Sequence, residues 1–378
     1  MYQAEPNKVI IASVPNIQNG NPYQTLFYAS LKKYNIDVMD NFILYMKFIL
    51  VNRKTIDIIH FHWYGTGQKN FFHEIVSIFH FTLKLFICKL LNIKIVWTAH
   101  NLFPHDTQRT MFQYLRRFIL VHFSDLIIVH FKKAKHSVSN LFHANPSKIV
   151  CMHHGLYDTA YPNSADKEEA RQYLSLDKQK TVLLYFGRVR RYKNIETLVQ
   201  AFKRIEQEDI VLVIAGETTD EHYTKELIEL TSGDNRIICH FRNIEDREIQ
   251  FFFNSADCVI LPYKNIFTSG TAMLALSFKK PVIMRECDFS KEYFNSDNSI
   301  LINSCTEDNL TIAITRFIEE KSRLIVSDDF INKYDWSKII DELFEVNIVR
   351  KVFTKKKPII KRLATTIGID CYKRGLLI

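Results

Sequence analysis

The chain has 378 residues but only 10 glycines and 9 prolines, and its 7 cysteines form no Cys-x-x-Cys motif and no paired spacing. So little glycine and proline excludes collagen-like and linker-rich proteins. Scattered cysteines favour reduced thiols over a disulfide framework or a zinc knuckle. The amino-terminal residues also lack the basic segment and long apolar core of a signal peptide. We therefore expect a globular cytoplasmic protein.

Three common ligand-binding signatures are also missing. The sequence contains no Gly-x-Gly-x-x-Gly motif, no Walker loop and no Asp-x-Asp pair. The first two absences argue against dinucleotide-binding and P-loop proteins. The third removes the carboxylate pair that usually holds a metal ion on a nucleoside diphosphate. We expect no metal and no cofactor, so protein cations and helix termini would have to stabilise a bound diphosphate.

The net charge of +9 is unevenly distributed, because residues 1–180 and 350–378 are basic and residues 181–349 are acidic. This pattern is not that of a uniformly basic nucleic-acid-binding protein. The most apolar long segment, 71–91, is interrupted by Glu74, Lys84 and Lys89, so we expect no spanning helix. We expect peripheral attachment to the anionic inner face of the cell membrane through this segment and a basic cluster: Arg350, Lys351, Lys355, Lys356, Lys357, Lys361 and Arg362.

Short β-branched runs alternate with amphipathic segments, which predicts parallel sheets covered by helices on both faces. Strands are expected at 9–14, 57–61, 94–98, 125–129, 149–152, 181–186, 210–215, 236–241, 257–261, 281–284 and 299–302. Helices are expected near 23–34, 70–91, 108–122, 132–142, 195–206, 220–231, 246–254, 271–278 and 307–319. The sequence therefore predicts an α/β protein with two Rossmann-like domains, 1–160 and 161–342, that face a central cleft.

Two loops that follow expected strands carry groups suited to an anion. After 181–186 come Gly187, Arg188 and Lys193, in front of an expected helix. Glycine permits close approach of a ligand, and cations beside a helix start suit a phosphate; the alternative is a basic loop in solvent. After 257–261 comes a second group that either caps the next helix or offers N–H groups to a diphosphate: Thr268, Ser269, Gly270 and Thr271.

Histidines follow the strands expected in the first half, and 12 of the 14 histidines precede residue 181. The strand-end histidines are His60, His62 (beside Trp63), His100, His130, His153 and His154. Such a group could supply a general base, contacts to sugar hydroxyls or metal ligands. No third ligand has the spacing of a zinc site. Any one of these residues could also be a structural histidine near a strand end.

The second half then shows a family resemblance, carried by segments 184–189, 193–202, 213–216, 253–262 and 275–283 and by Tyr334-Asp-Trp336. These segments resemble the donor-binding domain of GT-B glycosyltransferases of the family 4 type, the glycosyl transferases group 1. The resemblance implies a GT-B fold, a nucleotide-sugar donor in the second domain, an acceptor in the first and no metal. It also implies that a basic helical tail, 343–378, packs back on the first domain.

The resemblance assigns individual roles to residues in the loops of the second half. It places Arg188 and Lys193 on the donor pyrophosphate, with Gly187 beside them, and Asn243 and Ile244 along the nucleotide base. The helix start under the diphosphate comprises Ser269, Gly270 and Thr271, preceded by Thr268.

In the first half, the resemblance is limited to architecture and to Thr98-Ala-His-Asn, which lies where the family keeps an acceptor-site histidine. We expect His100 to deprotonate or orient the acceptor hydroxyl. If His100 only orients it, the base would be His105 or Asp106. The residues expected to contact the acceptor are His62, Trp63 and Asn101.

The sequence departs from the family at one motif, because Ile266 and Leu274 stand where the family has two glutamates. This loss leads us to expect inversion of the sugar's configuration. We expect a metal-independent hexosyltransferase of bacterial capsular or exopolysaccharide synthesis that uses a nucleotide sugar and a glycan or polyprenyl-diphosphate-linked acceptor, with no nucleic-acid partner. The alternatives are a nucleotide-sugar epimerase of the same fold and a non-catalytic protein that binds polyanions or membranes.

Overall fold

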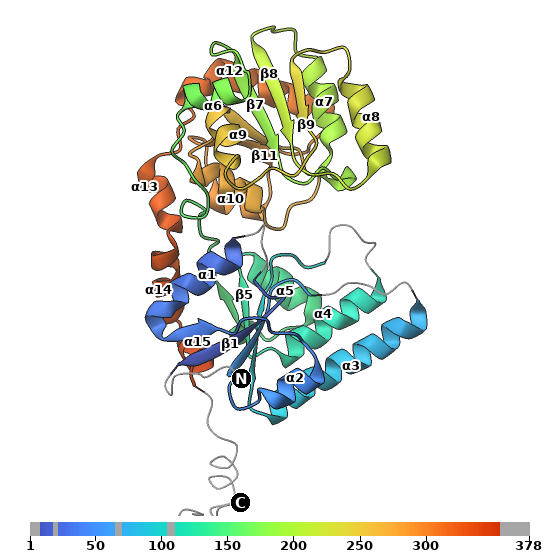
Figure 1. Ribbon diagram of the computed structural model, residues 1–378, viewed down its shortest axis with the longest axis vertical. Coiled ribbons are helices and arrows are strands. Elements are labelled where there is room, and N and C mark those ends of the chain that lie inside the picture. The colour runs from blue at the N-terminus through green and yellow to red at the C-terminus, as the bar shows by residue number, and fades with distance from the viewer. Residues whose placement is uncertain (1–7, 18–21, 65–69, 104–109, 356–378) are drawn as a thin grey trace, which may run out of the picture. The chain divides into compact units, whose positions relative to one another are not determined.

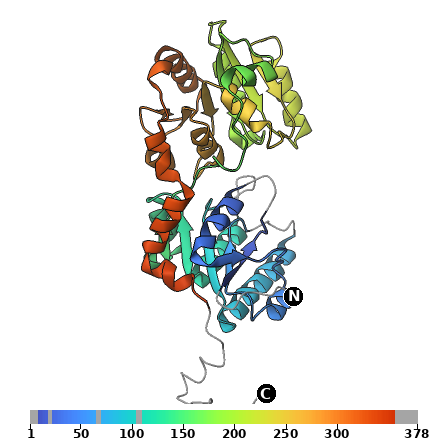
Figure 2. The same cartoon turned by 60° about the vertical axis from the view of Figure 1, so that its left-hand side comes forward.

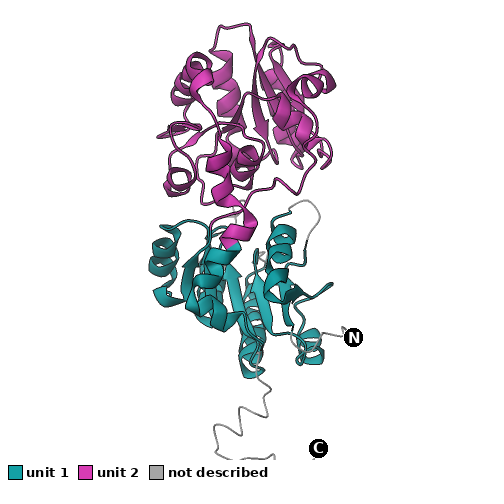
Figure 3. Cartoon of the chain, turned by 90° about the vertical axis from the view of Figure 1, so that its left-hand side faces the viewer, with its two compact units in different colours: residues 1–152, 340–378 teal, residues 153–339 magenta. Residues whose placement is uncertain are grey.

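A computed structural model describes residues 8–17, 22–64, 70–103 and 110–355. The chain divides into two compact units (Figure 3). The first unit comprises Met1–Met152 together with Ile340–Ile378, and the second comprises His153–Ile339. In each unit, helices lie on both sides of one sheet (Figures 1 and 2).

The sheet of the first unit has six parallel strands in the order β2-β1-β3-β4-β5-β6. Its strands are β1 (Val9–Val14), β2 (Ile36–Val38), β3 (Ile58–Phe61), β4 (Lys94–Thr98), β5 (Leu126–Val129) and β6 (Ile149–Cys151). Its helices are α1 (Tyr23–Leu31), α2 (Met46–Val51), α3 (Phe71–Leu90), α4 (Met111–Phe123), α5 (Ala134–Phe142) and α15 (Asn347–Val352). The order of the strands reverses between β1 and β3, so the sheet has its topological switch point there.

The sheet of the second unit also has six parallel strands, in the order β12-β11-β10-β7-β8-β9. Its strands are β7 (Thr181–Phe186), β8 (Ile210–Ala215), β9 (Ile237–His240), β10 (Cys258–Leu261), β11 (Val282–Arg285) and β12 (Ser299–Ile302). Its helices are α6 (Lys167–Tyr173), α7 (Ile195–Lys203), α8 (Glu221–Thr231), α9 (Ile249–Ser255), α10 (Gly270–Ser277), α11 (Asp288–Tyr293), α12 (Glu307–Glu320) and α13 (Asp328–Ile331). Helix α14 (Trp336–Glu345) contains the boundary between the units.

The strands form where the sequence is continuously apolar. Every residue of β1 and of β8 is buried, as expected for central strands of a parallel sheet with helices on both faces. Polar side chains cap the first turns of helices that connect the strands. Thr110 accepts a hydrogen bond from the Gln113 N–H at the start of α4, and Asp220 accepts one from the Tyr223 N–H at the start of α8. Such caps satisfy N–H groups that the first helical turn cannot pair.

Helix α3 is the one helix in the described part of the chain that is long and apolar enough, by length and composition, to cross a membrane. Its inner face is nevertheless attached to the first unit. Glu74 forms a buried ion pair with Arg116 of α4 at 2.6 Å, and Phe81 and Leu85 are fully buried. A carboxylate buried together with its guanidinium partner fixes the rotation of α3 about its axis, because turning the helix would leave a buried charge unpaired.

The predicted α/β architecture is confirmed, and each predicted strand lies within a residue of an observed one at either end. The elements that were not predicted include one strand, β2, and the helices α2, α11, α13 and α14. Strand β2 is an edge strand of three residues, of which only Ile36 is buried. A run this short shows too little alternation to be recognised from the sequence.

The observed division differs from the predicted boundary after residue 160. Residues 153–160 belong to the second unit because their backbone pairs with it: the Leu156 N–H donates to the Tyr334 carbonyl, and the Tyr157 N–H donates to Ser277 Oγ. Gly155 has no room for a side chain, since a Cβ there would lie 2.3 Å from the Trp336 ring. The second unit ends at Ile339, so α15 lies in the first unit, while residues 356–378 lie outside the described part.

Candidate functional site

The loops after β7 and β10 flank the switch point of the second sheet, where the strand order reverses. Ligands of doubly wound folds bind in the crevice at the carboxyl ends of such strands. Gly187 follows β7 with a φ of +129°, and Gly216 follows β8 with a φ of +150°. A Cβ at Gly216 would lie 2.0 Å from the Gly187 carbonyl oxygen, so only glycine permits this approach of the two loops.

Asn194 joins three loops of this edge. Its backbone is left-handed, with a φ of 61°, and it directly precedes α7. Its buried side-chain amide donates to the Pro262 carbonyl at 3.1 Å and to the Cys305 carbonyl at 3.0 Å. The loop after β7 is thereby fixed to the loops after β10 and β12. The sequence analysis did not single out Asn194, although an asparagine directly before a helix is a recognisable start signal.

The cations of the loop after β7 have different surroundings. The Lys193 ammonium lies 3.5 Å from the centre of the buried Tyr263 ring, a cation–π contact that holds the charge beside the loop after β10. Arg191 is bound in a bidentate pair to Glu226 of α8. Arg188 is exposed and has no carboxylate partner within the described ranges. Of the two cations predicted to bind a diphosphate, Arg188 therefore faces solvent and Lys193 lies against an aromatic ring.

Helix α10 begins at the same place. Ser269 caps it, accepting from the Ala272 N–H at 3.2 Å, so the capping interpretation of this serine holds. A Cβ added to Gly187 would lie 3.4 Å from Thr271 Oγ1, which places the loop after β7 beside the first turn of α10. The N–H groups of a first helical turn lack helical partners and carry partial positive charge. Thr268, half-buried, and Gly270, exposed, complete this turn.

Asn243 and Ile244 follow β9, two strands away from β7. Asn243 is exposed, whereas the Ile244 side chain is buried, and neither shares a hydrogen bond with the loop after β7 in the described structure. Ile266 is half-buried, and Leu274 is buried within α10. Neither of the two positions that carry glutamates in the resembled family therefore presents a carboxylate here.

The strand-end histidines of the first unit form one hydrogen-bonded chain. His62 Nδ1 lies 3.1 Å from His100 Nε2, and His100 Nδ1 lies 3.2 Å from His130 Nε2. His130 Nδ1 is bonded to the Met152 carbonyl at 3.0 Å. At the other end, Tyr28 Oη of α1 lies 2.8 Å from His62 Nε2.

The chain continues from Tyr28 into β3 and β4. Tyr28 Oη lies 3.1 Å from His60 Nδ1, and His60 Nε2 lies 2.8 Å from Thr98 Oγ1. All of these side chains are buried, and His100, at 7% exposed, is the most exposed of the four histidines. Sequence reasoning found the histidines because they end strands, but it missed Tyr28, which lies on a helix.

Two aromatic rings enclose His100. Trp63 stacks on its imidazole with ring centres 4.4 Å apart, and Tyr23 meets it edge-on at 4.6 Å. Of the three residues expected to contact the acceptor, Trp63 and Asn101 are half-buried and reach the surface of the first unit, whereas His62 is buried. His105 and Asp106, the other candidates for the base, lie outside the described residues.

Burial favours the neutral forms of His60, His62 and Tyr28. It lowers the pKa of His60 to about 3, and burial together with the neighbouring His60 and His130 lowers the pKa of His62 well below its usual range. Burial also raises the pKa of Tyr28 far above its usual range. Removing an imidazolium from water costs more than its hydrogen bonds return, so the neutral forms are favoured.

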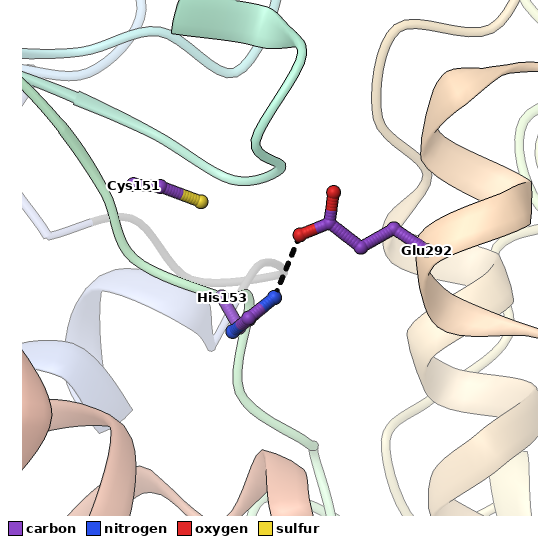
Figure 4. Close-up of side chains that lie close together, drawn as sticks. All are labelled: Cys151, His153 and Glu292. Carbon is purple, nitrogen blue, oxygen red and sulfur yellow. Dashed lines mark hydrogen bonds and ion pairs between the residues drawn. The ribbon is translucent and has the colours of Figure 1, made fainter.

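His153 and His154 do not join this chain, because they belong to the second unit. His153 Nε2 is bonded to Glu292 Oε1 of α11 at 2.8 Å (Figure 4). His154 is buried, its N–H donates to the Tyr293 hydroxyl, and burial lowers its pKa to about 4. Both have partners that account for them as structural residues.

Comparison with solved structures identifies the fold class. The fold is that of GT-B glycosyltransferases: it matches Anabaena Alr3699/HepE in complex with UDP and glucose at a TM-score of 0.65 and 15% identity, covering 90% of this chain and 98% of that one. A putative UDP-N-acetylglucosamine 2-epimerase from Listeria monocytogenes matches at a TM-score of 0.57 and 13% identity, covering 89% and 95%.

The sequence of the second unit matches a known protein family. Residues 166–333 match the family model described as "Glycosyl transferases group 1". The chain is 25% identical over 296 residues, 74% of each chain, to "GDP-mannose:glycolipid 4-beta-D-mannosyltransferase" from Xanthomonas campestris pv. campestris. It is 21% identical over 311 residues, 76% of this chain and 70% of the other, to "D-inositol 3-phosphate glycosyltransferase" from Corynebacterium aurimucosum. The predicted resemblance is confirmed, because residues 166–333 of the second unit match the model of this family.

The buried histidines predict acid sensitivity of the first unit. Because the folded pKa of His60 lies near 3 and the unfolded value near 6.5, the unfolded chain binds more protons between these values. Stability should be complete above pH 6.5 and should fall as the pH drops toward 3, by about 1.4 kcal/mol per pH unit for each such histidine.

Urea unfolding followed by the fluorescence of Trp63 and Trp97 measures this slope. His60→Gln should reduce the slope by the share of one histidine, whereas the exposed His136→Gln should leave it unchanged. An unchanged slope in His60→Gln would contradict a neutral, buried His60.

Proposed function

We propose that the protein transfers a hexose from a nucleoside diphosphate sugar to a glycan or polyprenyl-diphosphate-linked acceptor in surface polysaccharide synthesis, with inversion and without a metal. The observation that carries the donor assignment is the meeting of two loops at the switch point of the second sheet. There the Lys193 ammonium, the exposed Arg188 and the first turn of α10 converge on the position that doubly wound folds use for ligands.

This arrangement suits a leaving diphosphate. As the sugar–phosphate bond breaks, negative charge grows on the diphosphate, and preorganised cations and N–H dipoles stabilise it without a reorganisation cost. Each charge-assisted contact contributes roughly 1.5–3 kcal/mol. Since the sequence has no Asp-x-Asp pair, these groups take the place that a bound metal ion has in other transferases. The relative solved with UDP and glucose supports a nucleotide-sugar donor.

Two observations support inversion. The relative from Xanthomonas is named for making a 4-β-D-mannosyl linkage from GDP-mannose. Because GDP-mannose carries its sugar as the α-anomer, that product requires inversion. In addition, Ile266 and Leu274 remove the carboxylates of the resembled retaining family. A polar lipid-linked acceptor agrees with the glycolipid in that relative's name.

An epimerase is the second candidate, because a putative epimerase shares the fold. Epimerisation needs an acid and a base at the sugar and proceeds without an acceptor. Conversion of the nucleotide sugar to its epimer in the absence of any acceptor would favour that activity. A thermal-shift panel with UDP, GDP, CMP and dTDP identifies the donor class, and no shift with any of them would favour a non-catalytic binding protein.

Removing the two donor cations should weaken nucleotide binding. We expect Arg188→Ala and Lys193→Ala each to raise the Kd for the nucleoside diphosphate ~10- to 100-fold, the equivalent of one charge-assisted contact. Arg191→Ala is the matched control, because its guanidinium lies on the same loop but is bound to Glu226. Isothermal titration calorimetry measures the Kd, and a double variant that binds like the parent would refute the donor site.

The anomer of the first product tests the mechanism. We expect proton NMR during turnover to show first a product whose anomeric configuration is opposite to that of the donor. A product that retains the donor's configuration would overturn inversion, and it would leave the donor site of the second unit unaffected.

We also propose that the protein is cytoplasmic and attaches to the inner face of the membrane through α3. The outer face of α3 carries a row of apolar side chains at helical spacing that are 39–69% exposed: Phe72, Ile75, Phe79, Leu83, Phe86 and Leu90. Exposed Tyr45 and Val51 of the α2 region extend this face, and Lys84 lies 6.0 Å over the Tyr45 ring. An apolar helix face on a basic unit is typical of interfacial membrane helices.

The basic cluster near the carboxyl terminus contributes less than the sequence predicted, within the described residues. Arg350 is paired with Glu345, and Lys355 is paired with the fully buried Asp57 of the first unit at 3.0 Å. Lys356, Lys357, Lys361 and Arg362 lie outside the described residues. The proposal therefore rests on α3 and not on this cluster.

Membrane attachment predicts that three substitutions on α3 release the protein. Phe72→Ser, Phe79→Ser and Phe86→Ser together should weaken binding to anionic vesicles at least tenfold in flotation assays at low salt, because each buried phenyl ring contributes about 1.5–3 kcal/mol. The control is Ile228→Ser with Ile312→Ser, two exposed apolar residues of the second unit. Flotation of the triple variant equal to that of the parent, or no flotation of the parent, would contradict the proposal.

A further inference from the structure

Three consecutive backbone carbonyls at the start of the loop after β10, those of residues 262–264, accept hydrogen bonds from side chains. The donors stand at the ends of three other strands of the same sheet: Asn194 after β7, Cys305 after β12 and Arg285 at the end of β11. A segment outside helices and strands has no ladder partners for its carbonyls, and a buried carbonyl without a partner costs free energy. These three side chains therefore take the place of a backbone ladder and fix the first peptide planes of the loop.

Asn194 links the two members of the cation–π pair through their backbones. Asn194 Oδ1 accepts from the Thr197 hydroxyl at 2.8 Å, so the amide nitrogen is the atom that donates to the Pro262 carbonyl at 3.1 Å. Asn194 directly follows Lys193, and Pro262 directly precedes Tyr263. One buried amide therefore joins the residue beside the ammonium to the residue beside the ring that the ammonium contacts.

The peptide planes on both sides of Tyr263 are anchored. The Tyr263 carbonyl accepts from Cys305 Sγ at 3.6 Å, and burial raises the pKa of Cys305 to about 11, so the thiol keeps the proton that it donates. The preceding carbonyl, that of Pro262, accepts from Asn194. Because two anchored planes leave the φ and ψ of Tyr263 little freedom, its ring is held in place 3.5 Å from the Lys193 ammonium.

We infer that Asn194 is a positioning residue for the donor diphosphate, because it sets where the Lys193 ammonium lies relative to the loop after β10, with Cys305 in support. The inference rests on the proposed function for the diphosphate at this edge of the sheet. Asn194 acts through Lys193 and Tyr263 and not by contact with the ligand. A charge that is already in place when the anion arrives needs no reorganisation, and such preorganisation raises affinity.

Isothermal titration calorimetry with UDP, GDP and inorganic pyrophosphate tests this role. Asn194→Asp keeps the size of the side chain but replaces the amide nitrogen with oxygen, so the Kd of each probe that the parent binds should rise ~10-fold or more. Asn194→Gly suits the left-handed backbone but has no amide, and it should show the same loss. Leu176→Ala is the control for a general loss of stability and should bind like the parent, because Leu176 is buried ahead of β7, at the opposite edge of the sheet.

Two variants of Cys305 separate hydrogen bonding from packing. Cys305→Val fills a similar volume without a donor and should raise the Kd of the same probes ~3- to 10-fold. Cys305→Ser keeps a donor for the Tyr263 carbonyl and should bind more tightly than Cys305→Val. Equal Kd values for the two variants would overturn the supporting role of Cys305.

Nuclear magnetic resonance measures the position of Lys193 without a ligand. Protons held over the face of an aromatic ring resonate upfield, and the Lys193 side chain ends over the Tyr263 ring. In the full-length protein labelled with ¹³C-lysine, the ε-methylene signal of Lys193, assigned with Lys193→Arg, should lie upfield of the range of exposed lysines. Asn194→Gly should return this signal toward that range, whereas Leu176→Ala should not. A signal that stays shifted in Asn194→Gly, or one that is unshifted in the parent, would overturn the inference.

The outcomes separate the inference from the proposed function. Parent-like Kd values in both Asn194 variants would overturn the positioning role and leave the donor site in place. If neither Asn194 variant folds, Thr197→Val decides, because it removes the hydroxyl that orients the amide; a parent-like Kd in Thr197→Val would then overturn the role. Binding of none of the three probes by the parent would refute the proposed donor site, while the lysine signal would still report whether Asn194 sets the position of Lys193.

Discussion

A parallel sheet delivers the carboxyl ends of all its strands to one edge, and both polar clusters of this protein depend on that constraint. In the first unit, β3, β4 and β5 end in the four histidines, which are far apart in sequence and within hydrogen-bond distance in space. In the second unit, Asn194 binds the loops after β7, β10 and β12 to one another through two carbonyls. The sheet brings the loops together, and a few buried side chains then fix them.

The two clusters differ in how far their polar groups are exposed to solvent. The histidine chain is buried and pairs its polar atoms with one another, since an unsatisfied buried group costs about 1–3 kcal/mol. The loop after β7 keeps Arg188 in solvent and holds Lys193 against an aromatic face. Exposed cations are suited to meeting an anion that arrives from solution, whereas a closed neutral network is suited to holding one geometry.

The sequence predicted where the polar residues lie better than it predicted which groups they bind. Strand ends located His60, His62, His100 and His130 because a buried strand is recognisable from its composition. It did not predict their bonds, because the chain closes through Tyr28 of α1 and a backbone carbonyl, neither of which shows a pattern. The loop cations show the same limit. Arg188 and Arg191 look alike in sequence, but only the fold of α8 reveals that Glu226 already holds Arg191.

Existing hydrogen bonds also decide which residues can act as acids or bases. A base needs a lone pair that is not already accepting, and both ring nitrogens of His100 lie within hydrogen-bond distance of a neighbouring histidine. Breaking either of these bonds would leave a nitrogen of a buried histidine unpaired, which costs about 1–3 kcal/mol. A group that exchanges a proton with a substrate must be free of such buried bonds, so the histidine network is better suited to holding the ends of β3, β4 and β5 in one arrangement.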